Sequence, residues 1–264
     1  MSGAISLSGM GALRSGVGLA TLAVPDLCLE TVAALDPCYM TQPLPCDDDG
    51  RLVLAACEEI CRLAEKATCV AIGPGLGRSE EMTELVGRLY DTITQPMIVD
   101  ADALNALASR SDVLDHPGGP RIITPHPGEF RRLAGAETLS LDTSPERAVQ
   151  LAADHGIVVV LKGHRTVVTD GDNTTFNETG NPGMATGGVG DVLTGVIAAL
   201  VCQGLSPLDA ARLGVHVHGL AGDLAVSDLG EIGMVAGDLV DSLPEAFVLA
   251  TLTSEEEDPG ETSS

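Results

Sequence analysis

Residues 180–200 read GNPGMATGGVGDVLTGVIAAL and fall into two halves. The first half, 180–190, contains five glycines, one proline and no large side chain except Met184. The second half, 191–200, is an apolar run of good length for a helix. Glycines let backbone N–H groups converge, and a helix that starts just after them adds its own unpaired N–H groups and the positive end of its dipole. The stretch therefore predicts a pocket for a phosphate, or for charge that develops on one.

Asp191 stands where the predicted loop becomes the predicted helix. The helix dipole holds a carboxylate ionised at this position, so Asp191 is suited to accept a proton from a hydroxyl. The alternative interpretation is a tight turn followed by an Asp N-cap. Gly187, Gly188 and Gly190, directly before the acid, form a denser pattern than capping requires, which favours the functional interpretation.

The composition favours an α/β protein that acts on small molecules. Of the 264 residues, 44% are hydrophobic but only 2% are aromatic, so Ala, Val, Leu and Ile must fill the core, as in proteins with buried parallel strands. No apolar run reaches membrane-spanning length, and no signal-like segment is found at the start. A formal charge of −24 disfavours nucleic acid and anionic membranes as partners. An anionic nucleotide would need a local site of amides, a few cations and Mg²⁺.

The cysteines indicate a reducing compartment. Their number, seven, is odd, and no CxxC pair occurs among them. Both features favour reduced thiols in a cytoplasmic protein over a disulfide framework.

Four short apolar strands are predicted at 68–72, 97–99, 121–123 and 157–161. Each runs directly into an unusual loop: GPGLG at 73–77, DADALN at 100–105, TPHPGE at 124–129 and KGHRT at 162–166. In open parallel sheets, ligands collect at the carboxyl ends of the strands, so these loops should face one crevice that the glycine loop closes.

The remaining elements complete a single domain, predicted to span 1–252. A further strand is expected at 18–24, an irregular flap at 38–50 and a hairpin formed by 166–169 and 174–177. The acidic segment 253–264 is expected to be a disordered tail. Helices are predicted at 1–15, 26–35, 55–67, 80–93, 145–155, 207–230 and 235–250.

Taken together, the four strand-end loops and the glycine loop resemble the ADP-dependent NAD(P)H-hydrate dehydratase family, and they occur in that family's order. The resemblance runs from Gly3 to about Phe247. It implies a ribokinase-like α/β fold with a mostly parallel central sheet and helices on both faces. It also implies a repair enzyme that dehydrates the S-epimer of hydrated NADH or NADPH, with ADP as co-substrate, Mg²⁺ as cofactor and AMP as product.

This implied reaction agrees with the chemistry inferred from Asp191. Hydroxide is a poor leaving group, whereas a phosphorylated ring hydroxyl can depart as phosphate and restore the double bond. The first half is then a phosphoryl transfer, which depends mainly on positioning and charge stabilisation.

The resemblance assigns roles to particular residues. Asp191 is the expected catalytic base and also a substrate contact. The remaining expected contacts to the hydrated nucleotide are Ala4, Gly75, Gly77 and His126. The expected contacts to ADP or AMP are Lys162, Gly163, His164, Arg165, Thr166, Gly187, Gly188 and Gly190.

Several of these residues also have structural interpretations. Lys162 can be an exposed cation at a strand end, but a chain with only 14 Lys and Arg places Lys162, His164 and Arg165 within four positions, which favours a phosphate site. His126 can be a hydrogen-bonded loop residue, although its two flanking prolines suit a presented side chain. Three residues are candidate substrate or metal contacts whose alternative is helix capping: Asp102, Asn105 and Glu129.

The resemblance further implies a homo-oligomer, often a tetramer. Family members usually begin earlier, with a strand and a glycine-rich turn ahead of the segment that matches 3–15, so the first strand is expected to be absent. The family's frequent partner domain, an NAD(P)H-hydrate epimerase, is also expected to reside on a separate chain. Two alternatives remain: a vitamin-precursor kinase of the same fold, and a catalytically silent nucleotide-binding protein.

Overall fold

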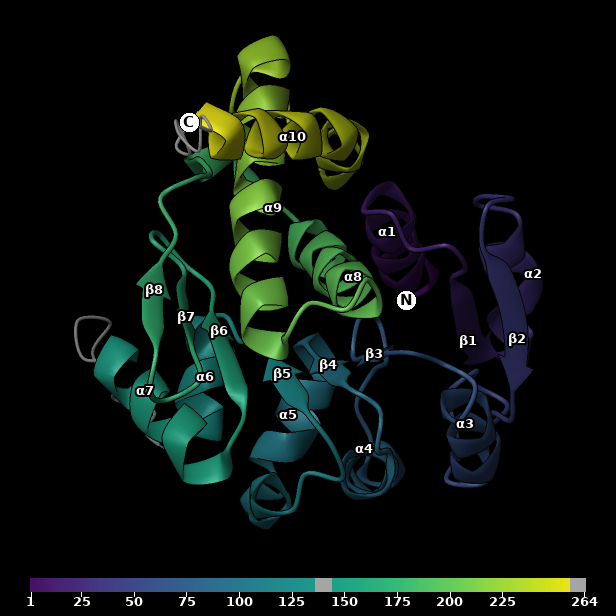
Figure 1. Cartoon of the computed structure of the whole chain (residues 1–264). Coiled ribbons are helices and arrows are strands. Elements are labelled where there is room, and N and C mark those ends of the chain that lie inside the picture. Colours follow the sequence, from purple (N-terminus) through teal and green to yellow (C-terminus); the bar gives the residue numbers. More distant parts are fainter. Residues whose placement is uncertain (136–143, 257–264) are drawn as a thin grey trace, which may run out of the picture.

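The main sheet has six strands whose order in space follows their order in the chain (Figure 1). The computed structural model describes residues 1–135 and 144–256. The first four strands are parallel, and the last two continue the sheet as an antiparallel hairpin. The strands are β3 (Val70–Ile72), β4 (Met97–Val99), β5 (Arg121–Ile123), β6 (Val158–Leu161), β7 (Val167–Thr169) and β8 (Thr174–Phe176). The predicted α/β class and mostly parallel sheet are confirmed.

Helices cover both faces of this sheet, as predicted. One face is covered by α3 (Ala56–Ala64), α4 (Glu80–Thr92), α5 (Ala101–Ala108), α6 (Pro127–Leu133) and α7 (Ser144–His155). The other face carries α8 (Val189–Cys202), α9 (Pro207–Leu229) and α10 (Ala236–Glu256), with α1 (Ser2–Arg14) packed beside α8.

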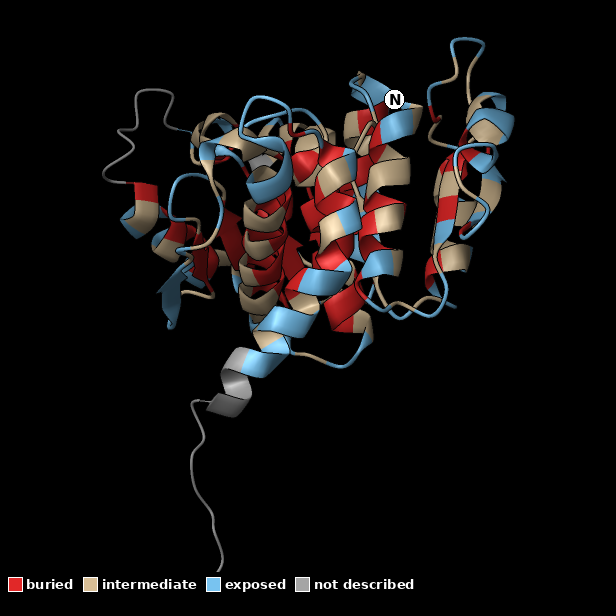
Figure 2. Ribbon diagram, turned by 90° about the horizontal axis from the view of Figure 1, so that it is seen from above, coloured by how far each residue is buried: buried red, intermediate tan, exposed pale blue. Residues whose placement is uncertain are grey.

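Successive strand residues serve the two cores in turn, because side chains of a strand alternate between its faces. Val99 and Ile123 belong to the core under α3–α7, whereas Ile98 and Ile122 belong to the core under α8–α10. Both faces of the strands are therefore buried, as expected for parallel strands made of Val and Ile. In the view from above in Figure 2, the buried residues run through the middle of the molecule and the exposed residues form its rim.

A separate pair of parallel strands, β1 (Thr21–Pro25) and β2 (Met40–Leu44), lies beside the main sheet, and η1 (Asp26–Cys28) and α2 (Leu29–Ala33) connect them. The prediction of an irregular flap at 38–50 is therefore wrong for β2. This strand pairs only with β1 in the described part of the chain, and an edge strand tolerates Pro43, which lacks a backbone donor.

Glycines bring α1 and α8 into close contact. A Cβ atom at Gly195 would lie 1.9 Å from the carbonyl oxygen of Ser8, and one at Gly11 would lie 2.6 Å from the carbonyl oxygen of Val192. Across this contact the Ser8 hydroxyl donates to the carbonyl oxygen of Asp191 at 2.8 Å. The packing of α1 thereby fixes the first turn of α8.

The end of the chain differs from the prediction. Helix α10 passes the predicted domain boundary at 252 and ends at Glu256. The rest of the predicted tail, 257–264, lies outside the described residues. Among the helices that are described, none is long and apolar enough to cross a membrane.

Candidate active site

The glycine loop turns into α8 at Gly188, which adopts the left-handed φ of +92°. A Cβ atom at this position would lie 2.5 Å from a methyl carbon of Leu7, so both conformation and space require glycine here. Gly187 is open to solvent on its Cβ side. Asp191 lies in the first turn of α8, where the sequence predicted it.

Helix α9 anchors both ends of this loop. The Asp223 carboxylate accepts hydrogen bonds from the Gly180 amide and from the Asn181 side chain, both at 2.9 Å. His218 approaches the Val189 carbonyl oxygen with its Nε2 at 2.9 Å. Burial lowers the pKa of His218 to about 4, so the ring is neutral at physiological pH.

A buried ion pair lies directly beneath the start of α8. Lys162, which follows β6, places its ammonium 2.7 Å from Asp100, which follows β4 and is only 1% exposed. The Thr194 hydroxyl donates to the second Asp100 oxygen at 2.9 Å. A Cβ atom at Gly190 would lie 3.2 Å from the Lys162 ammonium, so the glycine leaves room for that charge beside the first turn of α8.

Burial and the nearby Lys162–Asp100 ion pair change the acidity of Asp191. Burial and, to a smaller extent, the negative charge of Asp100 raise the pKa of its carboxyl to about 6, against the opposing effect of Lys162. A carboxylate with this pKa is ionised at neutral pH and more basic than an ordinary aspartate. It is therefore suited to accept a proton from a hydroxyl.

The structure also brings together several residues expected to contact substrate. Gly75 adopts a φ of +70°, and a Cβ atom there would lie 3.1 Å from the Cβ of Ala4. The Gly77 amide donates to Asp102 at 3.0 Å, and the Asp102 charge is close enough to Asp191 to raise its pKa. The GPGLG and DADALN loops thus lie at the same strand-end edge.

His126 and Glu129 form a capping box at the start of α6. The His126 Nδ1 accepts hydrogen bonds from the amides of Gly128 and Glu129, at 3.0 and 3.3 Å. The Glu129 carboxylate accepts from the His126 amide at 2.8 Å, and its other oxygen lies 3.3 Å from Nε2. Both ring nitrogens are engaged within the loop, so a substrate would meet the exposed part of the ring.

The KGHRT segment, 162–166, makes a tight turn between β6 and β7. Its side chains point to different parts of the molecule. The Thr166 hydroxyl donates to the Gly163 carbonyl oxygen at 3.1 Å and closes the turn. Arg165, with a φ of +58°, pairs with Glu178 at 3.7 Å and lies over the Phe176 ring. His164 is exposed. The structure brings Lys162 to Asp191, whereas Arg165 contacts the β7–β8 hairpin.

A magnesium ion would depend on nucleotide phosphates for most of its ligands. No group of three or more His, Cys, Asp or Glu side chains within 1–135 and 144–256 is arranged to hold a metal. Asn105 is engaged on both sides, since its amide donates to Ala101 and its oxygen accepts from Arg132. An Mg²⁺ ion at this edge of the sheet would therefore keep waters and phosphate oxygens as most of its ligands.

Three residues that shape the site were not predicted from the sequence: Asp100, Thr194 and Ser8. Asp100 is the first residue after β4, and it does not cap α5 with its side chain although it stands at the N-cap. The next residue, Ala101, has a φ of +49°, which is strained for a residue with a Cβ. An acid directly after a buried strand was a usable signal, but its partner Lys162 lies 62 positions later.

Comparisons with known proteins identify the family of the chain. A family model described as NAD(P)H-hydrate dehydratase matches residues 1–245. The bifunctional NAD(P)H-hydrate repair enzyme Nnr of Moorella thermoacetica is 44% identical over 259 residues, which cover 97% of this chain and 48% of that protein. The Nnr of Escherichia coli is 38% identical over 244 residues, 92% of this chain and 44% of that protein. The chain thus spans about half the length of these curated relatives.

Solved structures confirm the ribokinase-like fold. An ADP/ATP-dependent NAD(P)H-hydrate dehydratase from Bacillus subtilis, co-crystallised with ATP/Mg²⁺, has a TM-score of 0.76, 30% identity and coverage of 94% of this chain and 85% of that chain. A ribokinase-like superfamily protein from Enterococcus faecalis has a TM-score of 0.75, 26% identity and coverage of 94% and 82%. A hydroxyethylthiazole kinase from Pyrococcus horikoshii shares the fold at 18% identity, with a TM-score of 0.64 and coverage of 93% and 94%.

Proposed function

Because the chain belongs to the NAD(P)H-hydrate dehydratase family, we propose that it dehydrates the S-epimer of hydrated NADH or NADPH and consumes ADP. The observation that carries this proposal is the position of Asp191. Its carboxyl, with a pKa of about 6, lies in the first turn of α8 directly after the glycine loop. A base and a phosphate-binding backbone therefore share one helix start.

The first step transfers the β-phosphoryl group of ADP to the ring hydroxyl of the hydrated nicotinamide. Asp191 accepts the hydroxyl proton while the hydroxyl oxygen attacks phosphorus, and AMP leaves. Amides of Gly187, Gly188 and Gly190 stabilise the charge on the transferring group. Lys162, held by Asp100, adds a positive point charge beside them.

The second step breaks the bond between the ring carbon and the phosphate oxygen. Phosphate departs with the bonding electrons, the neighbouring ring carbon loses a proton, and the double bond of the reduced nicotinamide returns. Mg²⁺, arriving with the nucleotide phosphates, would neutralise part of their charge. Ala4, Gly75, Gly77 and His126 are the proposed contacts of the hydrated ring and its ribose. Asp102 fixes the loop that carries Gly77.

The remaining proposed nucleotide contacts are Gly163, His164, Arg165 and Thr166, in the turn after Lys162. The hairpin contacts of Arg165 make its guanidinium the least suited of these to reach the phosphates. The alternative function, a vitamin-precursor kinase, has only fold likeness at 18% identity in its favour.

The test supplies ADP, Mg²⁺ and hydrated NADH and follows the recovery of the reduced-nicotinamide absorbance. Asp191→Asn keeps the side-chain size but removes the base, so turnover should fall by about 100-fold to 10,000-fold. Asp209→Asn is the matched control, because Asp209 is also a first-turn acid, of α9. Near-normal turnover of a folded Asp191→Asn protein would refute the assignment.

We also propose a homo-oligomer, with a tetramer as the expected state. Large apolar side chains are exposed at two places near the end of the described chain. Leu229, Ile232 and Val235 lie at the α9–α10 connection, and Val248 and Leu252 lie late in α10. Exposed apolar residues in such groups favour an interface. Epimerisation of the R-form would be the task of a separate epimerase.

A further inference from the structure

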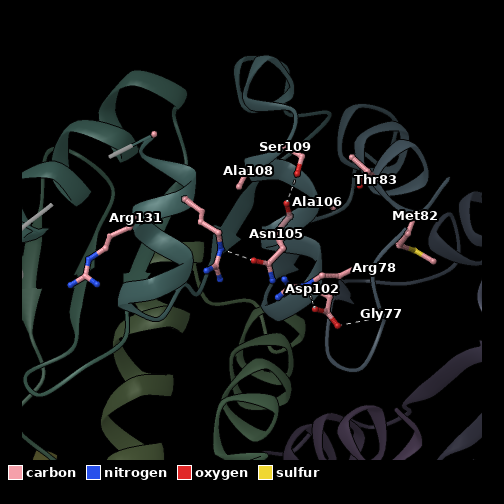
Figure 3. Close-up of a pocket in the computed structure, with 12 residues that line it drawn as sticks. Gly77, Arg78, Met82, Thr83, Asp102, Asn105, Ala106, Ala108, Ser109 and Arg131 are labelled. Atoms are coloured by element: carbon pink, nitrogen blue, oxygen red, sulfur yellow. Dashed lines mark hydrogen bonds and ion pairs between the residues drawn. The ribbon is translucent and has the colours of Figure 1, made fainter. Parts of the chain in front are cut away.

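A cavity of about 530 Å³ opens beside the strand-end crevice, between the start of α4, the outer side of α5 and the end of α6 (Figure 3). Its volume lies within the range of small-molecule sites. Two of its lining residues, Gly77 and Asp102, also belong to the loops that face Asp191. The cavity therefore adjoins the loops beside Asp191, in the direction in which a ligand with its reacting end at Asp191 could extend.

The cavity collects positive charge in a strongly negative protein. The whole chain has 14 Lys and Arg against 38 Asp and Glu, yet three arginines line this one cavity. Two of these arginines, Arg78 and Arg132, are hydrogen-bonded to residues of α5, and Asp102 is the single carboxylate among the described lining residues. Such a local excess of positive charge favours an anionic ligand where the overall field opposes one.

Arg78 and Arg132 are held from one side of α5. The Arg78 Nε donates to Asp102 at 3.1 Å, and the Arg132 Nε donates to Asn105 at 2.9 Å. Asp102 and Asn105 are three positions apart and lie on the same side of the helix, as Figure 3 shows. In the described part of the chain, no hydrogen bond engages the terminal Nη atoms of either arginine. Both guanidinium groups are thus oriented while their forked ends stay open to oxygen atoms.

We propose that this cavity binds a phosphate group at the adenosine end of the dinucleotide substrate, through the Nη atoms of Arg78 and Arg132. The inference rests on the proposed function, because it assumes that the nicotinamide end lies at Asp191. The dinucleotide carries two sources of such phosphate: the diphosphate bridge, and the 2′-phosphate that only the NADP form has. A planar guanidinium matches the oxygens of either group in a bidentate arrangement.

The test measures binding of two probes that lack nicotinamide, ADP-ribose and ADP-ribose 2′-phosphate, by calorimetry. ADP and Mg²⁺ are present at saturation to occupy the donor site. Arg78→Ala and Arg132→Ala should each weaken binding about tenfold or more, because a charged hydrogen-bond donor is lost. Arg88→Ala is the matched control, since Arg88 is also exposed and also pairs through Nε with a carboxylate, Glu84.

The two probes separate the two phosphate sources. Equal losses for both probes support the diphosphate bridge, and a loss confined to ADP-ribose 2′-phosphate supports the 2′-phosphate and a preference for hydrated NADPH. Arg78→Lys and Arg132→Lys keep the positive charge but lose the bidentate guanidinium. They replace the alanine variants in the binding measurement if an alanine variant does not fold. Binding equal to wild type in the Arg78 and Arg132 variants would overturn the proposal.

The same variants distinguish this inference from the proposed function. If the wild-type protein converts hydrated NADPH to NADPH and the arginine variants have the same KM for hydrated NADPH as the wild type, only the cavity assignment fails. If the probes bind in an arginine-dependent manner but no hydrated nucleotide is restored, only the proposed reaction fails.

Discussion

Burial sets most of the acidity of the proposed base, Asp191, and the neighbouring charges of Asp100 and Lys162 adjust it. The negative charge of Asp100 raises the pKa of Asp191, and Lys162, paired with Asp100 at 2.7 Å, lowers it. Because Asp100 is 1% exposed, its charge is poorly screened by water. Asp100 is therefore a positioning residue: it holds the ammonium beside Gly190 and keeps Asp191 more basic than an ordinary aspartate.

This charge balance predicts the pH dependence of the proposed reaction. The base works only when ionised, so kcat/KM should fall below pH 6, where Asp191 becomes protonated. Asp100→Asn removes the repelling charge and frees Lys162, and both changes lower the Asp191 pKa. The acid limb of the kcat/KM profile should therefore move to lower pH by about one unit, and the KM for ADP should rise.

Thr194→Val is the control for this experiment, because it removes a hydrogen bond to Asp100 but no charge. Its acid limb should stay near that of the wild-type enzyme. An Asp100→Asn profile that coincides with wild type would show that Asp100 does not act on Asp191.

Residues whose role depends on neighbours in the chain were predictable, and residues whose role depends on distant partners were not. The sequence placed Asp191 at a glycine-rich helix start, and the structure has it there. Asp100 was missed because its two partners lie 62 and 94 positions later. Arg78 and Arg132 were missed for the same reason, since only the folded α5 brings them to one cavity.

At the scale of elements, the contact between α1 and α8 determines where the turn that carries the proposed base lies. Backbone meets backbone at this contact, because Gly195 and Gly11 present no side chain. The Ser8 hydroxyl adds a hydrogen bond to the Asp191 carbonyl oxygen. A change in helix spacing would therefore move the base as well as cost stability.

Gly195→Ala tests this contact. The new methyl carbon would fall 1.9 Å from the Ser8 carbonyl oxygen, which cannot move without the helix, so α1 and α8 must separate. We expect a loss of about 3 kcal/mol in the free energy of unfolding, measured by denaturant titration, together with reduced turnover. Gly3→Ala in α1 is the control, because no atom lies within 4 Å of its added methyl and the fold should be unaffected. Equal stability of the two variants would contradict the close contact.

Elements with strong local signals were predicted well. The strand expected at 121–123 is β5 with the same bounds, and the hairpin about 170–172 is β7 and β8. Strand β2 was not recognised because its sequence, MTQPL, has neither alternation nor a continuous apolar run, and it contains a proline. Its pairing with β1 supplies the stability that its own residues do not indicate.

At the scale of the whole molecule, the exposed apolar groups at the α9–α10 connection and late in α10 predict self-association. Ile232→Asp and Val235→Asp would place charges in the proposed interface, and both positions are more than half exposed in the single chain. We expect the double variant to have a smaller mass by light scattering after size exclusion, with an unchanged fold by circular dichroism. Leu19→Asp, at an exposed leucine ahead of β1, is the control.

The spatial order of the six-stranded sheet has a consequence for how the protein is made. Each strand pairs with the one that precedes it in the chain, so a nascent polypeptide can extend the sheet step by step as it leaves the ribosome. The contact between Ser8 and Asp191 instead joins positions 183 residues apart. A chain synthesised only as far as β8 would thus hold all six strands of the sheet, whereas the turn that carries Asp191 takes its place only later, when α8 packs against α1.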